Sequence, residues 1–546
     1  MRRVVGVLLA LGAVLSLPAV AGAAGAKVLR VGTYHRIRGQ FTTIHAAVRA
    51  ARPGDWILIA PGDYKTRRSW IAAPRGHARF PAGVLITTRD LHIRGMNRNS
   101  VIVDGTKPGS ARCSRAASAQ NFGARTAGGG SVGGYARIAG APTGENGLMV
   151  YKAPNVSIEN LTACNFLGGS AEAGNQVWWN GGADTGKVGG HGFYGAYLTT
   201  TSTYLKSKTK AGEVSAATYG VFSSNWSGGT WNQIYASNFN DSGFYIGACQ
   251  QICNQTLNHG WAQYNALGYS GTNSGGRLLI EHSQFDHNQD GFDTNSQNAD
   301  EPAPQNGACP PGARPPIRGA HSCWVFYRNY VHDNNNPNVP TAGSAAAGPV
   351  GTGMSVAGGR NDTILDNRFS NNNAWGLIFV PYLDSGKPCG GGTLGGAFGA
   401  NSCVWDDFGN ALIGNRFSHN GSYGHPSNGD FAQINLENGH PTSCYSANTA
   451  PRGGSIQPAS AAAWQTSHPV CTGALVAAGA SDPKFLGEVL CDSQIELSPG
   501  TPASCPTGQY PRVAHIVMHR LPRGLKTMPN VCSGVPANPW CRRRKR

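Results

Sequence analysis

A short pattern of apolar and polar positions recurs along the middle of this 546-residue chain. Each copy has an apolar stretch, a small polar residue, an aromatic residue, an Asn or Asp three residues later, and then Gly. The aromatic residues of the six copies are Phe239, Tyr264, Phe285, Tyr330, Phe369 and Phe417. The first two intervals are 25 and 21 residues long, and a period in the low twenties predicts a solenoid of stacked coils.

The residues inside each period indicate the kind of solenoid. Short alternating strands are predicted at 156–158, 278–280 and 363–365, and no copy carries a helical pattern of ten residues. Asn and Gly fit the turns between strands, since both tolerate left-handed backbone conformations. We therefore expect stacked β-coils that share one core, with either an extra coil or a long inserted loop in the later intervals of 39 to 48 residues.

The beginning of the chain predicts a helix followed by a strand. Residues 43–51 place apolar side chains on one helical face, after a Thr cap and before Arg52-Pro53-Gly54. Strand 56–59 and a second Pro-Gly turn follow. This order resembles the N-terminal cap of right-handed parallel β-helix proteins, the pectate-lyase-like superfamily. Over roughly residues 40–440 the resemblance implies an all-β solenoid, a single-stranded right-handed parallel β-helix with an N-terminal helix cap and loop insertions.

Composition divides the chain into three parts. Residues 1–26 have the two arginines, the apolar run and the small residues of a secretory signal. Residues 27–440 are the predicted β-helix, with a basic cap and first coils at 27–115. Residues 441–546 lack the coil pattern, contain six cysteines and end in a basic tail, Arg542 to Arg546. We expect a secreted or extracellular monomer without a membrane span, with association with the cell surface as a further option.

Fourteen cysteines in a secreted chain favour disulfides over metal binding or catalysis. The expected short-range pairs are Cys249 with Cys253, Cys309 with Cys323, and Cys389 with Cys403. The last two pairs enclose Gly/Pro-rich loops. We therefore interpret these loops as pinned at their bases.

The net charge of +17 is concentrated at the two ends of the chain. Residues 27–115 hold 17 Lys or Arg against 4 Asp or Glu, and the tail adds five basic residues. The coil body is nearly neutral, which argues against a strongly basic groove along it. The basic ends predict attraction to anionic cell-wall polymers or acidic glycans, with solubilising charge as the alternative, and nucleic acid is an unlikely partner.

The richest cluster of candidate chemistry lies at residues 281–295. If Phe285 and Phe292 point inward, strand alternation places Asp293 and Asn295 outward. Alignment on the turn glycines then predicts one outward stack, made of Tyr245, Ser270, Asp293, Ser355 and Ile378. A long insertion at 296–322 follows and is able to wall a cleft.

Two kinds of chemistry are open at this cluster. Asp290 and Asp293 are a candidate carboxylate pair for acid/base work on a glycosidic bond. Alternatively, Asp290, Asp293, Asp300 and Glu301 are candidate calcium ligands. In lyases of the resembling superfamily a Lys or Arg is often the base, and Arg318, with Arg277 and Arg360, is the nearest candidate. Ordinary turn chemistry also explains an Asp beside Gly.

Further candidate site residues are expected to contact a substrate rather than to react with it. Tyr245, His287 and Asn295 lie near the cluster, and Trp178 and Trp179 offer aromatic faces that can stack on sugar rings. Gly190-His191-Gly192 and Asp406-Asp407 look like polygalacturonase motifs, but their order is reversed and their companion motifs are absent. We assign neither a catalytic role.

The sequence therefore predicts a secreted β-helix protein that acts on or binds polysaccharide. A polysaccharide lyase or a glycoside hydrolase is the leading interpretation, with calcium as the one candidate cofactor. A non-catalytic β-helix that binds cell surface or matrix through its basic ends is the alternative.

Overall fold

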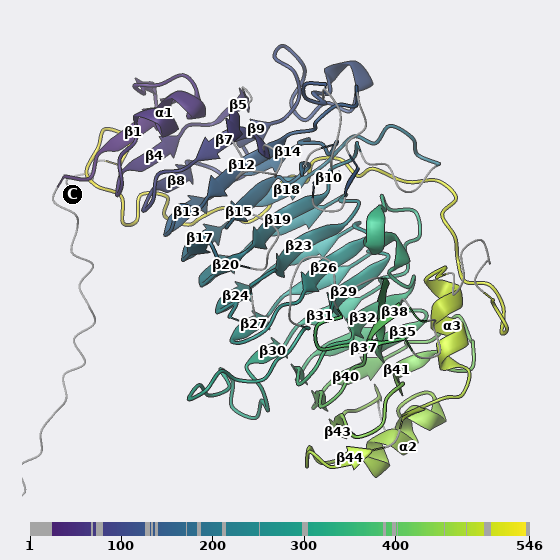
Figure 1. Ribbon diagram of the computed structural model, residues 1–546. Helices are drawn as coiled ribbons and strands as arrows, with labels where there is room; N and C mark the ends of the chain where they lie inside the picture. The colour runs from purple at the N-terminus through teal and green to yellow at the C-terminus, as the bar shows by residue number, and fades with distance from the viewer. Residues whose placement is uncertain are drawn as a thin grey trace, which may run out of the picture.

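The computed structural model describes most of the chain and shows a right-handed parallel β-helix. The described residues are 25–66, 69–71, 80–125, 131–132, 135–136, 140–170, 172–182, 187–209, 215–249, 252–297, 304–385, 389–395, 400, 402–451, 454–476, 478–495 and 504–541. Residues 1–24 of the predicted signal at 1–26 and the tail at 542–546 lie outside them. In Figure 1 the strands stack along one axis, with the N-terminal strands at one end and α2 at the other.

Three long sheets run along the stack, and each coil contributes a strand to them in turn. Sheet 1 is parallel throughout. Its strands are β1 (Val28–Val31), β4 (Trp56–Ile59), β8 (His92–Gly95), β13 (Val156–Glu159), β17 (Phe193–Ala196), β21 (Gly229–Asn232), β24 (Gln255–Asn258), β27 (Leu278–Glu281), β30 (Trp324–Tyr327), β33 (Thr363–Leu365), β39 (Ala411–Ile413) and β43 (Cys444–Ser446).

Sheet 2 is parallel except at its two outermost strands, which pair antiparallel with their neighbours. It contains most of the longer strands, so it offers a broad outer face. Its strands are β6 (Ser69–Ile71), β7 (Phe80–Ile86), β12 (Asn146–Tyr151), β15 (Val177–Asn180), β19 (Tyr219–Ser224), β23 (Ser242–Gly247), β26 (Leu267–Thr272), β29 (Asp290–Asn295), β32 (Thr352–Ala357), β35 (Trp375–Val380), β41 (Gly429–Asn435) and β45 (Gly479–Ala480).

Sheet 3 is parallel and is built from strands of three or four residues. These are β5 (Gly62–Lys65), β9 (Val101–Asp104), β14 (Thr162–Cys164), β18 (Thr199–Thr201), β22 (Tyr235–Ser237), β25 (Trp261–Gln263), β28 (Gln284–Asp286), β31 (Tyr330–His332), β34 (Arg368–Ser370) and β40 (Arg416–Ser418). Because β28, β31, β34 and β40 follow one another directly in this sheet, the long later intervals contain inserted loops and no extra coil.

The predicted inward aromatics are confirmed in four copies of the repeat. Phe239, Phe285, Phe369 and Phe417 are buried in the common core, the last three on strands β28, β34 and β40 of sheet 3. The alignment is wrong at the other two copies, by two residues at Tyr264 and by one residue at Tyr330. Ala262 and Val331 share the register position of Phe285, so Tyr264 and Tyr330 lie outside the core. Tyr264 has φ 61° and stacks on His519, with ring centroids 3.5 Å apart.

Asparagine side chains form ladders inside the turns between the sheets. Asn367 is fully buried, and its Oδ1 accepts hydrogen bonds from the backbone N–H of Asn329 at 2.8 Å and from Asn329 Nδ2 at 3.2 Å. Its own Nδ2 donates to the Phe326 carbonyl and to Asn415 Oδ1, both at 2.9 Å. The recurring Asn of the sequence therefore satisfies backbone groups of successive coils, which an interior strand end would otherwise leave unpaired.

Helices lie at both ends of the stack. α1 (Ile44–Ala50) begins at Thr43, whose Oγ1 accepts the Ala46 N–H, and it buries Ile44, Ala47 and Val48 in the core beside the first strands. α2 (Ala459–Ser467) buries Ala461 in the same core beside β41 and β43. α3 (Phe485–Asp492) packs on the outer face of sheet 2 next to β41.

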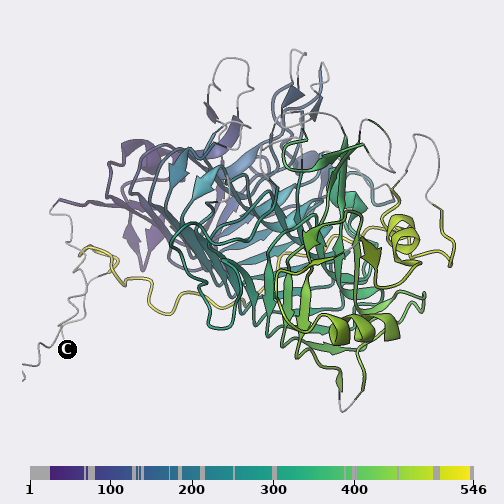
Figure 2. The same ribbon diagram turned by 60° about the horizontal axis from the view of Figure 1, so that its bottom comes forward.

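The C-terminal segment returns along the whole stack. In both views the yellow strap, residues 504–541, runs back from α3 to the purple N-terminal strands (Figure 1 and Figure 2). His519 N donates to Asn238 Oδ1, Arg94 donates to the carbonyls of Val531 and Ser533, and Trp540 Nε1 donates to the Ile37 carbonyl. The strap therefore bonds to the N-terminal part of the described chain.

Seven disulfides join all fourteen cysteines. The three predicted pairs, Cys249 with Cys253, Cys309 with Cys323 and Cys389 with Cys403, are confirmed. The other pairs are Cys113–Cys164, Cys444–Cys471, Cys491–Cys505 and Cys532–Cys541. Among the described residues, no helix is long and apolar enough to cross a membrane.

Candidate functional site

The outward stack predicted from the turn glycines is present on sheet 2. Tyr245 pairs with Ser270, Ser270 with Asp293, Asp293 with Ser355, and Ser355 with Ile378, on five neighbouring strands from β23 to β35. Phe292, next to Asp293, lies in the core. Strand alternation therefore fixes Asp293 on the outer face, as the sequence predicts.

A cavity of about 590 Å³ lies directly over this stack. Its floor is sheet 2, and its walls come from η2 (Gly343–Ala347), α3 and the start of β36 (Tyr382–Ser385). Of the insertion at 296–322, the described residues contribute only Gln297 to the lining. The walls thus come mainly from segments far along the chain, and the volume suits a small ligand or a few sugar units.

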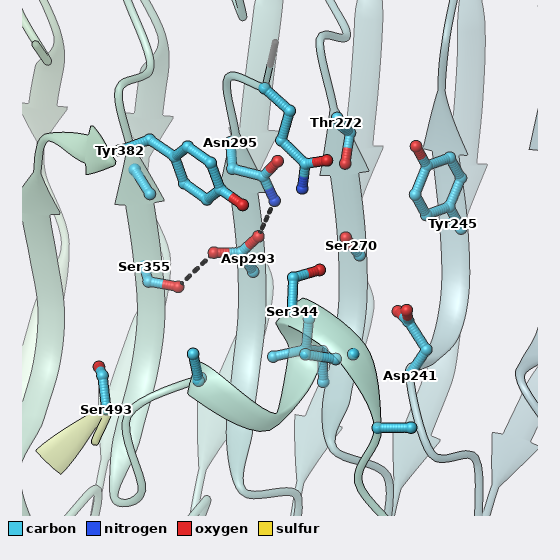
Figure 3. Close-up of a pocket in the computed structure, with 18 of the residues that line it drawn as sticks. Asp241, Tyr245, Ser270, Thr272, Asp293, Asn295, Ser344, Ser355, Tyr382 and Ser493 are labelled. Carbon is cyan, nitrogen blue, oxygen red and sulfur yellow. Dashed lines mark hydrogen bonds between the residues drawn. The ribbon is translucent and has the colours of Figure 1, made fainter. Parts of the chain in front are cut away.

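Asp293 is held by two neighbours inside this cavity. Ser355 Oγ lies 2.7 Å from its Oδ1, and Asn295 Nδ2 donates to its Oδ2. Burial raises its pKa to about 6, against the lowering effect of these two hydrogen bonds. Figure 3 shows both partners beside the carboxylate, with the Tyr382 hydroxyl pointing toward the same group.

Asp241 is a second carboxylate in the same cavity, and the sequence analysis missed it. It lies just before β23, and Tyr219 donates its hydroxyl to Asp241 Oδ2 at 3.0 Å. Burial raises the pKa of Asp241 to about 7, and the nearby Asp293 charge adds to the shift. Two carboxyl groups that titrate close to neutral pH therefore face one cavity.

Asp290 does not line this cavity. It is fully buried, and its Oδ2 lies 2.7 Å from the same Ser355 Oγ that contacts Asp293. Its Oδ1 accepts the Phe292 N–H at 3.2 Å. Burial raises the pKa of Asp290 well above its usual range, and the Asp293 charge acts in the same direction. Asp290 is thus buried beneath the cavity lining, and the Ser355 hydroxyl lies between it and Asp293.

The remaining lining is half polar and half apolar. Asn295, Ser270 and Thr272 face the cavity from the sheet, as do the predicted contact residue Tyr245 and its neighbour Phe222. The apolar lining comes from Leu267, Ile378 and Val380 on sheet 2 and from Leu486, Val489 and Leu490 on α3. Burial raises the pKa of Tyr382, so its hydroxyl stays a hydrogen-bond donor at neutral pH.

No Lys, Arg or His belongs to the described lining of the cavity. Arg318 is exposed on the loop that the Cys309–Cys323 disulfide closes. Arg360 donates to the Gly391 carbonyl and packs over the Phe408 ring, 4.7 Å from its centroid. The structure therefore does not bring the candidate arginine base Arg318 to Asp293.

Three other predicted contact residues lie away from the cavity. Trp178 is on the outer face of sheet 2 but is covered by Phe80 and Phe222, with 1% of its surface exposed. Trp179 points into the core. His287 is exposed in the turn after β28, where its Nδ1 lies 2.6 Å from Asp286 Oδ2.

The predicted calcium ligands are only partly described. Asp300 and Glu301 lie outside the described residues, and both oxygens of Asp293 are already engaged by Ser355 and Asn295. Within the described chain, convergent groups of three His, Cys, Asp or Glu occur at two other places. One contains the Cys113–Cys164 disulfide, and the other joins Asp406, Glu437 and His440. Calcium binding at Asp290 and Asp293 therefore stays a prediction.

Comparisons with known proteins add nothing beyond the fold. No protein-family model and no curated protein matches the chain. Among solved structures, the A-module of the Azotobacter vinelandii mannuronan C-5 epimerase AlgE4 is 13% identical, with a TM-score of 0.38, over 69% of this chain and 85% of that one. The AlgE6 A-module is 12% identical, with a TM-score of 0.38, over 75% and 95%. Pectin methylesterase PemA from Erwinia chrysanthemi is 10% identical, with a TM-score of 0.26, over 79% and 91%.

Proposed function

We propose that this protein is a secreted glycoside hydrolase that acts on a neutral polysaccharide, with Asp241 and Asp293 as its two working carboxyl groups. The observation that carries the proposal is their shared cavity, in which both carboxyl groups have pKa values raised toward neutrality by burial. Hydrolysis of a glycosidic bond needs one carboxyl group that is protonated and one that is ionised.

The surroundings of the two carboxyl groups assign the roles, since burial raises both pKa values and two hydrogen bonds lower that of Asp293. Asp241, with a pKa of about 7, stays protonated in mildly acidic solution and is the general acid for the leaving oxygen. Asp293, with a pKa of about 6, loses its proton first and is the base or nucleophile. Ser355 and Asn295 both direct hydrogen-bonding groups at Asp293, which holds its carboxylate plane in place.

The charge of the cavity favours a neutral substrate over a uronate. A lyase must bind a carboxylate sugar and neutralise it before proton abstraction, which calls for a cation. The described lining offers carboxyl groups and no basic side chain, so a uronate would be repelled there unless a metal ion intervened. Hydroxyl groups of a neutral sugar find Asn295, Ser270, Thr272 and Tyr382 as partners.

The test is to incubate the mature protein with neutral and uronate polysaccharides, with and without calcium. Release of reducing ends is followed together with the absorbance of unsaturated uronates. We expect reducing ends from a neutral glycan without new absorbance. Absorbance from a uronate polymer in calcium contradicts the proposal in favour of a lyase. If the folded protein releases neither reducing ends nor unsaturated uronates, the result contradicts the proposal in favour of a binding role for the β-helix and its basic ends.

A further inference from the structure

Ser355 stands between two carboxyl groups at equal distance. Its Oγ lies 2.7 Å from Asp290 Oδ2 and 2.7 Å from Asp293 Oδ1. A serine hydroxyl carries one proton and can donate it to one acceptor only. If both aspartates were ionised, one of these contacts would set an oxygen lone pair against a carboxylate oxygen. Two short contacts at one hydroxyl therefore require a second proton, carried by one of the carboxyl groups.

The surroundings decide which aspartate carries that proton. Asp290 is fully buried, and its one other described hydrogen bond is the Phe292 N–H at Oδ1. Two carboxyl groups, Asp293 and Asp492, raise the cost of a charge on Asp290, and Arg512 contacts Asp492 at 3.8 Å. Asp293 instead faces the cavity and receives the Asn295 amide. The proton therefore belongs on Asp290 Oδ2.

We propose that Asp290 is a neutral positioning residue that donates its proton to Ser355 Oγ, so that Ser355 donates in turn to Asp293 and keeps it ionised and oriented. The proposal rests on the proposed function for its catalytic consequence, but the proton arrangement itself does not. The chain of donors runs from Asp290 to Ser355 to Asp293, and Asn295 completes it from the other side. Asp290 is thus no member of the catalytic pair, in contrast to the sequence-based prediction.

The consequence is a lower pKa for Asp293 than its burial alone would give. The groups that face Asp293 are Ser355 and Asn295, which stabilise its charge, the neutral Tyr382 hydroxyl, and the carboxyl group of Asp241, whose charge opposes it. Loss of one hydrogen bond to a charged group costs about 1.5–3 kcal/mol, which corresponds to about 1–2 pKa units. Loss of the hydrogen bonds from Asp290 to Ser355 and from Ser355 to Asp293 should therefore move the acid limb of the pH–rate profile to higher pH.

Asparagine at position 290 tests whether the second proton lies on Asp290 or on Asp293. The Phe292 N–H selects the amide oxygen for the Oδ1 place, so the amide nitrogen of Asp290→Asn faces Ser355 and can donate as the protonated acid does. Leucine at the same position has similar bulk and cannot donate. We compare Asp290→Asn, Asp290→Leu and Ser355→Ala by the pH of the acid limb of kcat/KM, after a melting curve for each.

We expect the acid limb of Asp290→Asn to stay at the wild-type pH and those of Asp290→Leu and Ser355→Ala to move up by about 1–2 pH units. An equal upward shift in Asp290→Asn and Asp290→Leu overturns the proposal, because a donor at position 290 then has no effect on Asp293. A downward shift in both variants also overturns it, because removal of a negative charge beside Asp293 lowers the pKa of Asp293 and means that Asp290 is ionised. Infrared difference spectra at pH 8 decide the proton position without any activity. Wild type minus Asp290→Asn should contain the carbonyl band of a protonated carboxyl group, and its absence from a folded pair refutes a neutral Asp290.

Discussion

Replacement of Asp241 by Asn should stabilise the protein at alkaline pH and not at acidic pH. The carboxyl group is buried on the cavity side of sheet 2, where Tyr219 is its described hydroxyl donor. Asparagine keeps an oxygen for that hydroxyl and has no charge to bury. The variant therefore removes one electrostatic cost from the folded state while it leaves the shape of the site nearly unchanged.

The sign and size of the effect follow from the shift in pKa. The folded-state pKa of about 7 lies above the unfolded value of 3.8. Below about pH 4 both states are protonated and Asp241 has no effect. Between pH 4 and 7 the folded state holds the extra proton, so wild-type stability falls as the pH rises. Above pH 7 the full cost is present, about 4 kcal/mol at 1.36 kcal/mol per pKa unit.

The assay is thermal melting of wild type and Asp241→Asn at pH 4.5 and pH 8.5. About 4 kcal/mol corresponds to a gain in Tm of about 4 °C for a chain of roughly 500 ordered residues. Asp366→Asn, at an exposed aspartate on the turn after β33, is the control and should show no such difference. If Asp241→Asn gains as much at pH 4.5 as at pH 8.5, Asp241 does not titrate in this way, and its role as the general acid loses its basis.

Two further predictions concern the scaffold. Asn367→Ala removes the amide donor to the Phe326 carbonyl and the acceptor of the Asn329 N–H, while Asn415 Oδ1 keeps the backbone N–H of residue 367. The free energy of unfolding should therefore fall by about 3 kcal/mol. Asn258→Ala on the outer side of β24, measured in the same denaturant series, should cost far less, and equal losses would refute the ladder. Trp540→Ala removes the donor to the Ile37 carbonyl at the end of the strap, so limited proteolysis should cut the strap faster than in wild type while the coils stay intact, and an unchanged cleavage rate would contradict the anchoring role.

The sequence predicts the coil interior well where a phenylalanine recurs at the same place in successive coils. Phe285, Phe369 and Phe417 repeat with their Asn and Gly partners, and the turn glycines fix the register that places Asp293 outward. The alignment fails at Tyr264 because Ala262, two residues earlier, fills the core, and at Tyr330 because the next residue, Val331, does so. At Tyr330 an aromatic residue stands next to an apolar one, which leaves two registers open.

The rest of the site depends on contacts between segments far apart in the chain. In the sequence Asp241 looks like an ordinary turn aspartate. Its place in the cavity depends on the packing of η2 and α3 over sheet 2. The strap binds mostly through backbone carbonyls and amides, as Arg94 with Val531 and Ser533 shows, and such contacts leave no periodic pattern. The covering of Trp178 by Phe80 likewise joins residues about a hundred positions apart.

The decisive measurement compares wild type with Asp293→Asn in the release of reducing ends from a neutral polysaccharide, with Asp366→Asn as the control and a melting curve for each protein. We predict that wild type and the control release reducing ends, and that Asp293→Asn loses this activity with no loss of thermal stability. Full activity in a folded Asp293→Asn protein, or none in wild type on any neutral glycan, would contradict a hydrolytic site at Asp293.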